Sequence, residues 1–408
     1  MTSYRRKSWR AEMTVRLDIN GALHDLVGEE GLTVEDLEAL APRIGEVHES
    51  LEARRSEPGF HQLLHDKKGI EQILELAGDV RGEFDTLVVL GIGGSALGTR
   101  ALYSALRPPF HSSRPGSAEN GARLIVADSV DPKTFGAILD EIDVHKTAFN
   151  VISKSGETAE TMSQFLVVRE RLLKVLGAVD YAQRVVITTD PHAGALRQIV
   201  NDEGFRSLPI PPGISGHFSV LSAVGLFPAA VAGVDVHALV AGAASMDERC
   251  RTPSLFQSPA YLHAAVHYLA HTRRKRNVHV VMPYCDALAG VATWFSQLWA
   301  ECLGKERGLD GMPVVGGQTS LTAAGAADQH SQLQLFTEGP NDKIVTFFRV
   351  EDHGMRVEVP SGYADIDAVG YLGSRTLGEL LNLEQRATEI LLSRRGRQST
   401  TLHVPAVN

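Results

Sequence analysis

The sequence has few cysteines, no excess of basic charge and no apolar run long enough for a membrane helix. Its three cysteines, Cys250, Cys285 and Cys302, form neither an even framework nor a CxxC pair. This usage argues against a disulfide scaffold and favours free thiols in a reducing compartment. The formal net charge is −9. A nucleic-acid partner is therefore not expected, because binding phosphates requires a basic surface.

Targeting and membrane signals are also missing. The basic stretch MTSYRRKSWRAEM contains no apolar core, so it lacks the pattern of a secretory signal peptide. The most membrane-like stretch, residues 220–234, is shorter than the roughly 20 residues that span a bilayer, and Pro228 interrupts it. It predicts a buried helix beside a domain boundary. We expect a cytoplasmic protein that has no membrane partner.

The sequence does contain the pattern of an α/β fold. Hydrophobic residues make up 43% of 408 residues, which is enough for two domains with cores of ordinary size. Short Val/Ile/Leu runs end in turn residues and are followed by helical segments, a pattern typical of parallel sheets covered on both faces. The predicted strands are DTLVVLGIGG, ARLIVADS, TAFNVISKSG and RVVITTDP, then residues 277–284, 312–317, 343–350 and 400–406.

This pattern divides the chain into three parts. Residues 1–60 are predicted to be a helical segment, in which Thr33 is a plausible N-cap with Asp36 three residues later. Residues 61–240 are predicted to form a first α/β/α sandwich, and residues 241–408 a second one. The fold class is therefore α/β, with two tandem sandwiches and mainly parallel sheets.

A glycine-rich loop follows the first predicted strand. Gly91 to Ala96 reads G-x-G-x-x-A between a strand and a helix, which is formally the dinucleotide fingerprint of an NAD-dependent dehydrogenase. However, Asp128 lies 37 positions after Gly91, further than the fingerprint's spacing of about 20. In physical terms, the glycines expose N–H groups at a helix N-terminus, an arrangement that suits any anion.

A second polar turn, SKSGETAET, follows the third predicted strand. Ser153, Ser155 and Thr158 surround Lys154 at a strand-to-helix turn. Three hydroxyls and exposed N–H groups at a positive helix end would hold one phosphomonoester. The alternative is an ordinary helix cap, in which Ser155 caps the helix and Thr158 only packs.

The second half contains candidates for acid–base chemistry. Gln297 and Glu301 are spaced i,i+4 on a predicted helix, so Glu301 is a candidate general base, although it could instead pair with Lys305. His330 opens a helix and is a candidate acid or base near neutral pH; the alternative is a capping or surface histidine. The i,i+4 series His263, His267 and His271 is interpreted as a helix face and not as a metal site, because the sequence places no carboxylate or cysteine nearby.

The order and spacing of five motifs resemble the phosphoglucose isomerase family of the bacterial type. These are GIGGSALG, SKSGETAET, FSVLSAVGLFP, QLWAECLGKE and GAADQHSQLQ, and the resemblance runs from about residue 30 to the last residue. It implies two sugar-isomerase (SIS) domains and usually a homodimer with shared active sites. It implies no metal and no organic cofactor.

The resemblance also implies a reaction and the residues that perform it. The family interconverts glucose 6-phosphate and fructose 6-phosphate through a cis-enediol(ate), in glycolysis and gluconeogenesis. Glu301 resembles its base, and His330 resembles the residue that assists ring opening, which in the family reaches the partner's site. The expected substrate contacts are Gly94, Ser95 and Gln297 on the sugar and Ser153, Lys154, Ser155 and Thr158 on the phosphate.

Two features depart from the family pattern. His217 stands where the family usually has an arginine that stabilises the enediolate, so lower turnover is expected. The family also normally continues past the last strand into helices that carry a glutamine and a catalytic lysine. Residues 346–408 include seven arginines and no lysine, so a truncated sandwich is expected. The alternative function is therefore a non-catalytic SIS-domain protein that binds sugar phosphate.

Overall fold

The computed structural model describes residues 7–111, 121–314 and 316–408. The chain divides into two compact units. We call Arg54–Ala244 the continuous unit, and Met1–Ala53 together with Ser245–Asn408 the discontinuous unit. The division falls within helix α11 (Val236–Cys250). The N-terminal segment is therefore part of the second sandwich. No local pattern in the sequence predicts that these two distant parts of the chain pack together.

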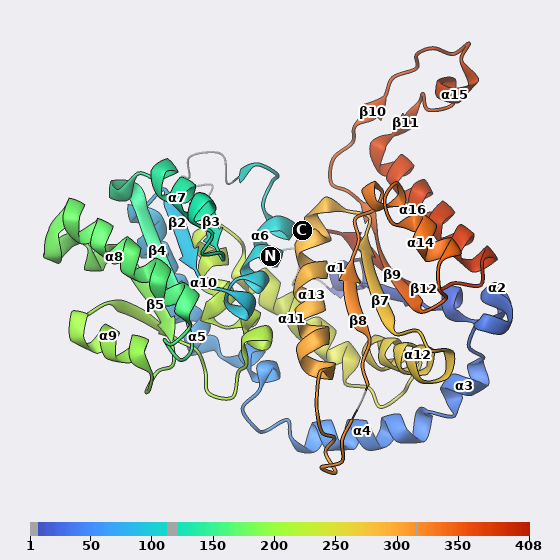
Figure 1. The fold of residues 1–408 in the computed structure, drawn as a ribbon, viewed down its shortest axis with the longest axis horizontal. Coiled ribbons are helices and arrows are strands. Elements are labelled where there is room, and N and C mark those ends of the chain that lie inside the picture. The colour runs from blue at the N-terminus through green and yellow to red at the C-terminus, as the bar shows by residue number, and fades with distance from the viewer. Residues whose placement is uncertain (1–6, 112–120, 315) are drawn as a thin grey trace. The chain divides into compact units, whose positions relative to one another are not determined.

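The continuous unit contains an entirely parallel sheet (Figure 1). Its strand order is β3-β2-β4-β5-β6, and every neighbouring pair is parallel. The order reverses between β2 and β4, and open α/β sheets bind ligands beyond the carboxyl ends of the strands at such a point. The strands are β2 (Thr86–Leu90), β3 (Arg123–Ala127), β4 (Thr147–Ile152), β5 (Val185–Thr189) and β6 (Arg206–Pro209).

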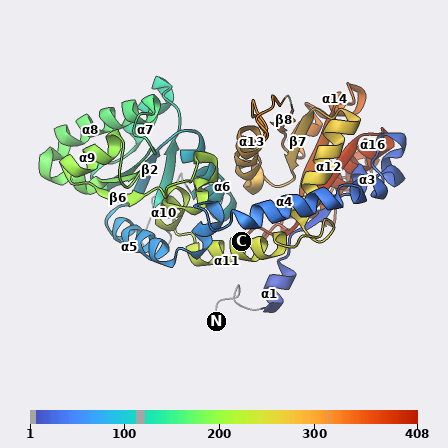
Figure 2. The same cartoon turned by 90° about the horizontal axis from the view of Figure 1, so that it is seen from below.

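Helices cover both faces of this sheet (Figure 2). One core cluster joins the sheet to α5 (Lys67–Glu83) and α10 (Ala223–Val231). The other joins it to α7 (Pro132–Glu141), α8 (Ala159–Asp180) and α9 (Ala195–Glu203). All nine residues of α10 are buried, which confirms the buried helix expected within residues 220–234. Within the described ranges, no helix has the length and apolarity needed to cross a membrane.

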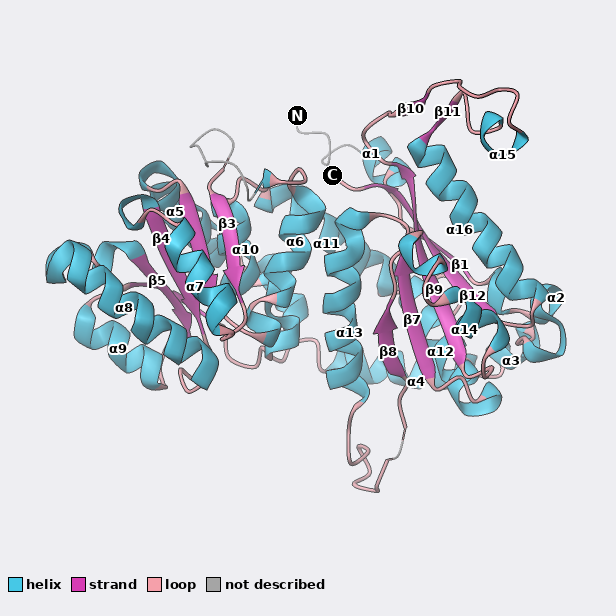
Figure 3. Ribbon diagram, turned by 45° about the horizontal axis from the view of Figure 1, so that its top comes forward, coloured by secondary structure: helices cyan, strands magenta, loops and turns pink. Residues whose placement is uncertain are grey.

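The discontinuous unit contains a mixed sheet of order β1-β12-β9-β7-β8 (Figure 3). Only the pair formed by β1 and β12 is antiparallel. Two sheets, one parallel and one mainly parallel, confirm the predicted fold class. The strands are β1 (Arg16–Asp18), β7 (Val278–Pro283), β8 (Thr319–Thr322), β9 (Lys343–Asp352) and β12 (Gln398–Ala406).

The prediction of a strand at residues 312–317 was wrong. The edge strand is instead β8, which begins at Thr319. The apolar residues that suggested the earlier position, Met312 and Val314, are 63% and 42% exposed, and Pro313 forms only an isolated bridge. An apolar run in a surface loop imitates a buried strand in sequence, whereas the true edge strand is short and polar.

Helices also cover both faces of the second sheet. Buried residues of α12 (Pro259–Arg274) and α3 (Val34–Glu38) pack together on one face. On the other face, α14 (Leu333–Glu338) and α16 (Leu377–Arg394) contribute to a separate cluster. Helix α13 (Ala289–Leu303) lies along β7 and β8.

The remaining elements are short or peripheral. Thr33 and Asp36 form a capping box at the start of α3, which confirms the predicted N-cap. Strands β10 (Glu358–Val359) and β11 (Arg375–Thr376) form an antiparallel pair. The remaining helices are α1 (Lys7–Glu12), α2 (His24–Val27), α4 (Ala41–Ala53), α6 (Leu97–Leu106) and α15 (Asp367–Gly370).

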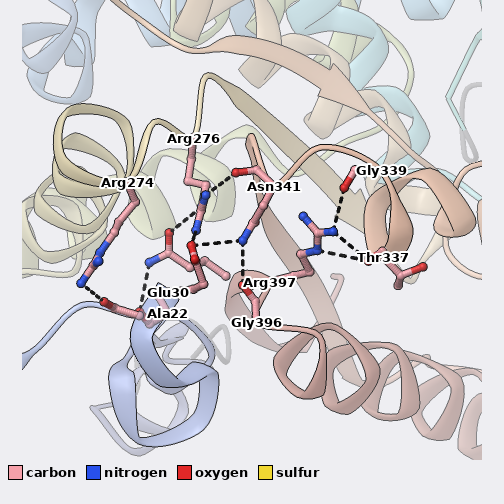
Figure 4. Close-up of polar contacts among 11 residues, drawn as sticks. Ala22, Glu30, Arg274, Arg276, Thr337, Gly339, Asn341, Gly396 and Arg397 are labelled. Carbon is pink, nitrogen blue, oxygen red and sulfur yellow. Dashed lines mark hydrogen bonds and ion pairs between the residues drawn. The ribbon is translucent and has the colours of Figure 1, made fainter.

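A polar network closes the amino ends of the strands in the discontinuous unit (Figure 4). The buried guanidinium of Arg276 donates hydrogen bonds to the Glu30 carboxylate, the Asn341 carbonyl and, at 3.3 Å, Gln398 Oε1. Asn341 Nδ2 donates to Glu30 at 3.2 Å. Arg397 donates to two carbonyl oxygens before β9. The network ties the N-terminal segment to β9 and β12, so it has a structural role at the edge away from the carboxyl ends.

Candidate active site

The glycine-rich loop lies at the carboxyl end of β2. A Cβ atom built on Gly94 would lie 2.2 Å from the carbonyl carbon of Gly216, so only glycine allows these two backbone segments to touch. Ser219 Oγ donates to the Gly94 carbonyl at 3.4 Å. Ser95 ends the short turn Gly93–Ser95 that precedes α6. The loop is therefore fixed against the segment Gly216–Leu221.

The hydroxyl-rich turn lies at the carboxyl end of β4, next to β2 in the sheet. Ser153 Oγ accepts the Gly156 N–H at 3.1 Å and lies 3.0 Å from Thr158 Oγ1. Ser155 Oγ accepts the Glu157 N–H at 3.1 Å. The N-cap of α8 is Thr158, and its side chain makes no capping bond. The alternative in which Ser155 simply caps the helix is therefore not observed, and the hydroxyls gather in one turn.

Three hydrogen bonds from two side chains hold this turn in place. Lys154 Nζ donates to the Ile214 carbonyl at 3.0 Å, which leaves the ammonium group with further donors. Thr189 Oγ1, at the end of β5, donates to the Ser153 carbonyl at 2.7 Å and to the Lys154 carbonyl at 3.2 Å. Sequence reasoning missed Thr189, although the hydroxyl pair in VVITTDP was an available signal.

A turn beside Lys154 carries a fixed negative charge. Asp190 Oδ1 accepts the N–H groups of His192 and Ala193 at 2.9 and 3.0 Å. These bonds, first of all the one from His192, lower the pKa of Asp190. An ionised Asp190 balances part of the charge of Lys154, and it closes the turn that follows Thr189.

His217 is buried at the start of the segment that touches the glycine loop. Its side chain is 8% exposed, and its Nε2 lies 3.5 Å from Ser215 Oγ. Its ring packs on Phe218, which stacks on Phe60 at a centroid distance of 4.7 Å. The structure therefore gathers seven predicted site residues around two carboxyl-end loops of one unit, namely Gly94, Ser95, Ser153, Lys154, Ser155, Thr158 and His217.

The acidic residue expected of a dinucleotide site is already engaged. Asp128 follows β3, which neighbours β2, and this is the place where a ribose-binding carboxylate would lie. Arg100 donates to both of its oxygens, at 2.6 and 2.7 Å. The pairing leaves the glycine loop without the partner that an adenosine ribose needs, so the geometry disfavours the NAD interpretation.

Glu301 and Gln297 meet on α13 of the discontinuous unit. Gln297 Nε2 donates to Glu301 Oε1 at 2.8 Å, which confirms that the two side chains share a helix face. Helix α13 ends at Leu303, so Lys305 lies outside it and the helical i,i+4 spacing does not extend from Glu301 to Lys305. Glu301 is exposed in the single chain. Its accessibility suits a group that must reach a substrate.

His330 lies in a turn after β8. Ala323 and Gly325 donate to the carbonyl oxygens of Val281 and Pro283, both at 3.0 Å, so the turn lies at the carboxyl end of β7. Asp328 closes the turn through the Ser331 hydroxyl and the Ala324 N–H, and these bonds lower its pKa. His330 itself is exposed.

Glu301 and His330 consequently lie near opposite ends of the strands in their sheet, with His330 at the carboxyl ends and Glu301 toward the amino ends. Helix α13 starts after the carboxyl end of β7 and runs back along β7 and β8. Glu301 lies about 18 Å along it from Ala289, at 1.5 Å per residue. Gly317, which precedes β8, approaches Leu303 at that end. One copy of this unit does not bring the carboxylate and the imidazole together.

The histidine series on α12 differs from the sequence interpretation. His263 and His267 do share a helix face, but His279 from β7 joins them, and one ring nitrogen of each lies within 4.8 Å of the others. His271 lies apart, with its Nε2 accepting the Gly317 N–H at 3.4 Å. Sequence reasoning missed His279 because the alternation in NVHVVMPY marks it only as a buried strand residue.

Comparison with known proteins gives this geometry a context. A model of the family described as phosphoglucose isomerase matches residues 64–351. The glucose-6-phosphate isomerase of Rubrobacter xylanophilus is 45% identical over 381 residues, which cover 93% of this chain and 85% of that protein. The glucose-6-phosphate isomerase of Carboxydothermus hydrogenoformans is 40% identical over 399 residues, covering 97% of this chain and 86% of that protein.

Solved structures agree with the sequence matches. A hypothetical protein from Thermus thermophilus superposes with a TM-score of 0.84 at 35% identity, covering 97% of this chain and 89% of that one. A glucose-6-phosphate isomerase from Chlamydia trachomatis gives a TM-score of 0.79 at 19% identity, covering 97% and 80%, and it supports the fold alone. From the family model and the two close relatives in sequence, the chain belongs to the phosphoglucose isomerase family.

Proposed function

We propose that this protein interconverts glucose 6-phosphate and fructose 6-phosphate, as a cytoplasmic enzyme of glycolysis and gluconeogenesis. The proposal rests on one observation. This member of the family has both a hydroxyl-rich turn suited to a phosphate group, which we call the phosphate cradle, and an oriented, accessible carboxylate, that of Glu301. The cradle would fix the substrate's phosphate. The carboxylate would act on the carbons beside its carbonyl group.

The cradle binds the anion with neutral donors and one cation. The hydroxyls of Ser153, Ser155 and Thr158 lie in one turn at the N-terminus of helix α8, where the helix dipole is positive. Lys154 adds a full positive charge. A phosphomonoester held there leaves the rest of an open-chain sugar free to extend, and we assign Gly94 and Ser95 to its contacts.

Glu301 is the proposed base. A proton beside a carbonyl group is weakly acidic, so the base must be close and correctly oriented before catalysis begins. Gln297 supplies that orientation through its 2.8 Å hydrogen bond. One carboxylate can remove the proton from C2 and return it to C1 on the same face of the enediolate. Gln297 would also contact the sugar.

We assign His330 to the active site of a second subunit in a homodimer. The assignment rests on the opposite placement of His330 and Glu301 within one unit. A two-fold symmetric dimer exchanges equivalent residues between its two sites, so each site would combine Glu301 of one chain with His330 of the other. There the imidazole would assist ring opening by proton transfer.

The test of the function is isomerisation by the purified protein. We expect fructose 6-phosphate to form from glucose 6-phosphate, with exchange of the C2 proton into deuterated solvent. The rival function, a sugar-phosphate-binding protein without catalysis, predicts saturable binding and no exchange. Binding without C2 exchange would therefore overturn the proposal and favour the rival.

We expect His217→Arg to raise kcat/KM. Histidine lacks the fixed charge and planar fork that arginine presents to an enediolate. Because one donor to a developing oxyanion contributes about 10²-fold or more to kcat, we expect a gain of about tenfold from partial restoration. Steady-state kinetics would measure it.

The matched control is His217→Gln, which keeps a polar side chain but adds no charge. It should not exceed the rate of the unmodified protein. If a folded His217→Arg variant is no faster than the unmodified protein, His217 does not lie near the enediolate.

A further inference from the structure

A cluster of three imidazoles lies in the core of the discontinuous unit, apart from the proposed reaction. His263 and His267 are spaced i,i+4 on α12, and His279 projects from β7 against them. One ring nitrogen of each lies within 4.8 Å of the others, and His267 and His279 are buried. Buried polar groups in a core are costly, so a converging set of three requires an explanation.

The three Nε2 atoms converge on one hydroxyl. Thr346 Oγ1 lies 2.8 Å from His279 Nε2, 3.3 Å from His267 Nε2 and 3.5 Å from His263 Nε2. It also lies 3.0 Å from Thr400 Oγ1. A threonine hydroxyl donates one hydrogen bond and accepts at most two, so it cannot satisfy all four of these neighbours.

A neighbouring amide fixes one imidazole in the tautomer that binds metals. Gln318 Nε2 donates to the Arg276 carbonyl at 2.8 Å, which leaves its Oε1 facing His267 Nδ1 at 3.0 Å. Nδ1 must then carry the proton, and Nε2 carries a lone pair directed at the cluster. An amide or carboxylate that orients a histidine in this way is typical of protein metal sites.

Burial disfavours the charged form of all three imidazoles. Burial lowers the pKa of His263 to about 4, and burial also lowers the pKa values of His267 and His279. The neutral imidazole is the form that binds metals. His279 Nδ1 is buried and has no hydrogen-bond partner in the part of the chain that the structure describes.

We propose that the Nε2 atoms of His263, His267 and His279 bind one divalent transition metal ion, most suitably zinc, cobalt or nickel. Imidazole suits these ions, and two histidines spaced i,i+4 on a helix are an established half of such sites. A tetrahedral ion at 2.0–2.1 Å places its ligand nitrogens about 3.3 Å apart. Binding therefore requires ring nitrogens that lie up to 4.8 Å apart to close by about 1.5 Å.

The metal would support the helix that carries the proposed base. The Trp299 ring of α13 lies 4.8, 5.3 and 6.3 Å from the ring centroids of His279, His267 and His263. Glu301 is two residues further along, so at 100° per residue it faces away from the cluster. The ion would thus join α12 and β7 beneath α13 without touching substrate.

Cobalt binding tests this site. Metal-free protein, prepared with a chelator, is titrated with Co²⁺ while the visible absorption of cobalt and the tryptophan fluorescence are followed. We expect one equivalent to bind, with tetrahedral absorption bands, quenching from Trp299 and a raised Tm. His263→Gln, the substitution at the least buried ligand, should weaken binding at least tenfold.

Two further variants make the test decisive even if His263→Gln folds poorly. His271→Gln removes a histidine from the same helix outside the cluster and should bind Co²⁺ as the unmodified protein does. Thr346→Val removes the hydroxyl but keeps all three imidazoles and should also bind. If the unmodified protein fails to bind one equivalent, or if His263→Gln binds Co²⁺ equally well, the three histidines are not a metal site and only form hydrogen bonds in the core.

Discussion

Replacing Glu301 by glutamine is expected to lower kcat about 10³-fold, within the 10²–10⁴ range that a positioned acid–base group contributes. Glutamine keeps the length and shape of the side chain, so the contact with Gln297 can persist in another form. It cannot accept a proton from carbon at neutral pH. We therefore expect KM to change little, because the phosphate cradle that holds the substrate belongs to other residues.

The measurement is exchange of the C2 proton into deuterated solvent, followed alongside net isomerisation. Exchange reports proton removal even when product release is slow. Glu306→Gln is the control, because Glu306 is another exposed carboxylate just beyond the end of α13. Undiminished exchange in Glu301→Gln would show that another group is the base.

Mixing two inactive variants is expected to restore about a quarter of the normal activity. Glu301→Gln lacks the proposed base and His330→Ala lacks the ring-opening imidazole, so each homodimer has two defective sites. Random reassembly makes half of the dimers mixed, and each mixed dimer has one site with both residues intact. The gain from near zero would be large, and it depends only on which chain supplies His330.

The control for this mixing experiment uses a double variant. When Glu301→Gln is mixed with a chain carrying both substitutions, no site of any dimer is intact, and activity should stay near zero. Differently tagged chains verify that mixed dimers form. Mixed dimers without recovered activity would mean that His330 does not complete a partner's site.

Much of the fold was predictable because local signals were strong. Strand β2 is fully buried and reads as a continuous apolar run, and the apolar helix α10 follows the same logic. The capping box of Thr33 is a short-range feature that needs no tertiary context. The loops after β2 and β4 were found because glycines and hydroxyls stand directly after apolar strands.

Other features depended on contacts between distant segments. Strand β1 has three residues and exists through its pairing with β12. His279 looked like any buried strand residue until β7 was placed against α12. The exposure of Glu301 could not be predicted, because the apolar sequence of its helix does not show which faces the rest of the chain covers.

The pairing of β1 with β12 has a consequence for how the chain folds during synthesis. Leu17 is the register partner of Leu402, so the ribosome must make both sheets and the helices between these residues before the pair can form. The continuous unit can fold once Ala244 has emerged, while the N-terminal segment waits with its apolar residues unpaired. A chaperone that binds short apolar segments would therefore find a target in the segment around β1 until β12 has been synthesised.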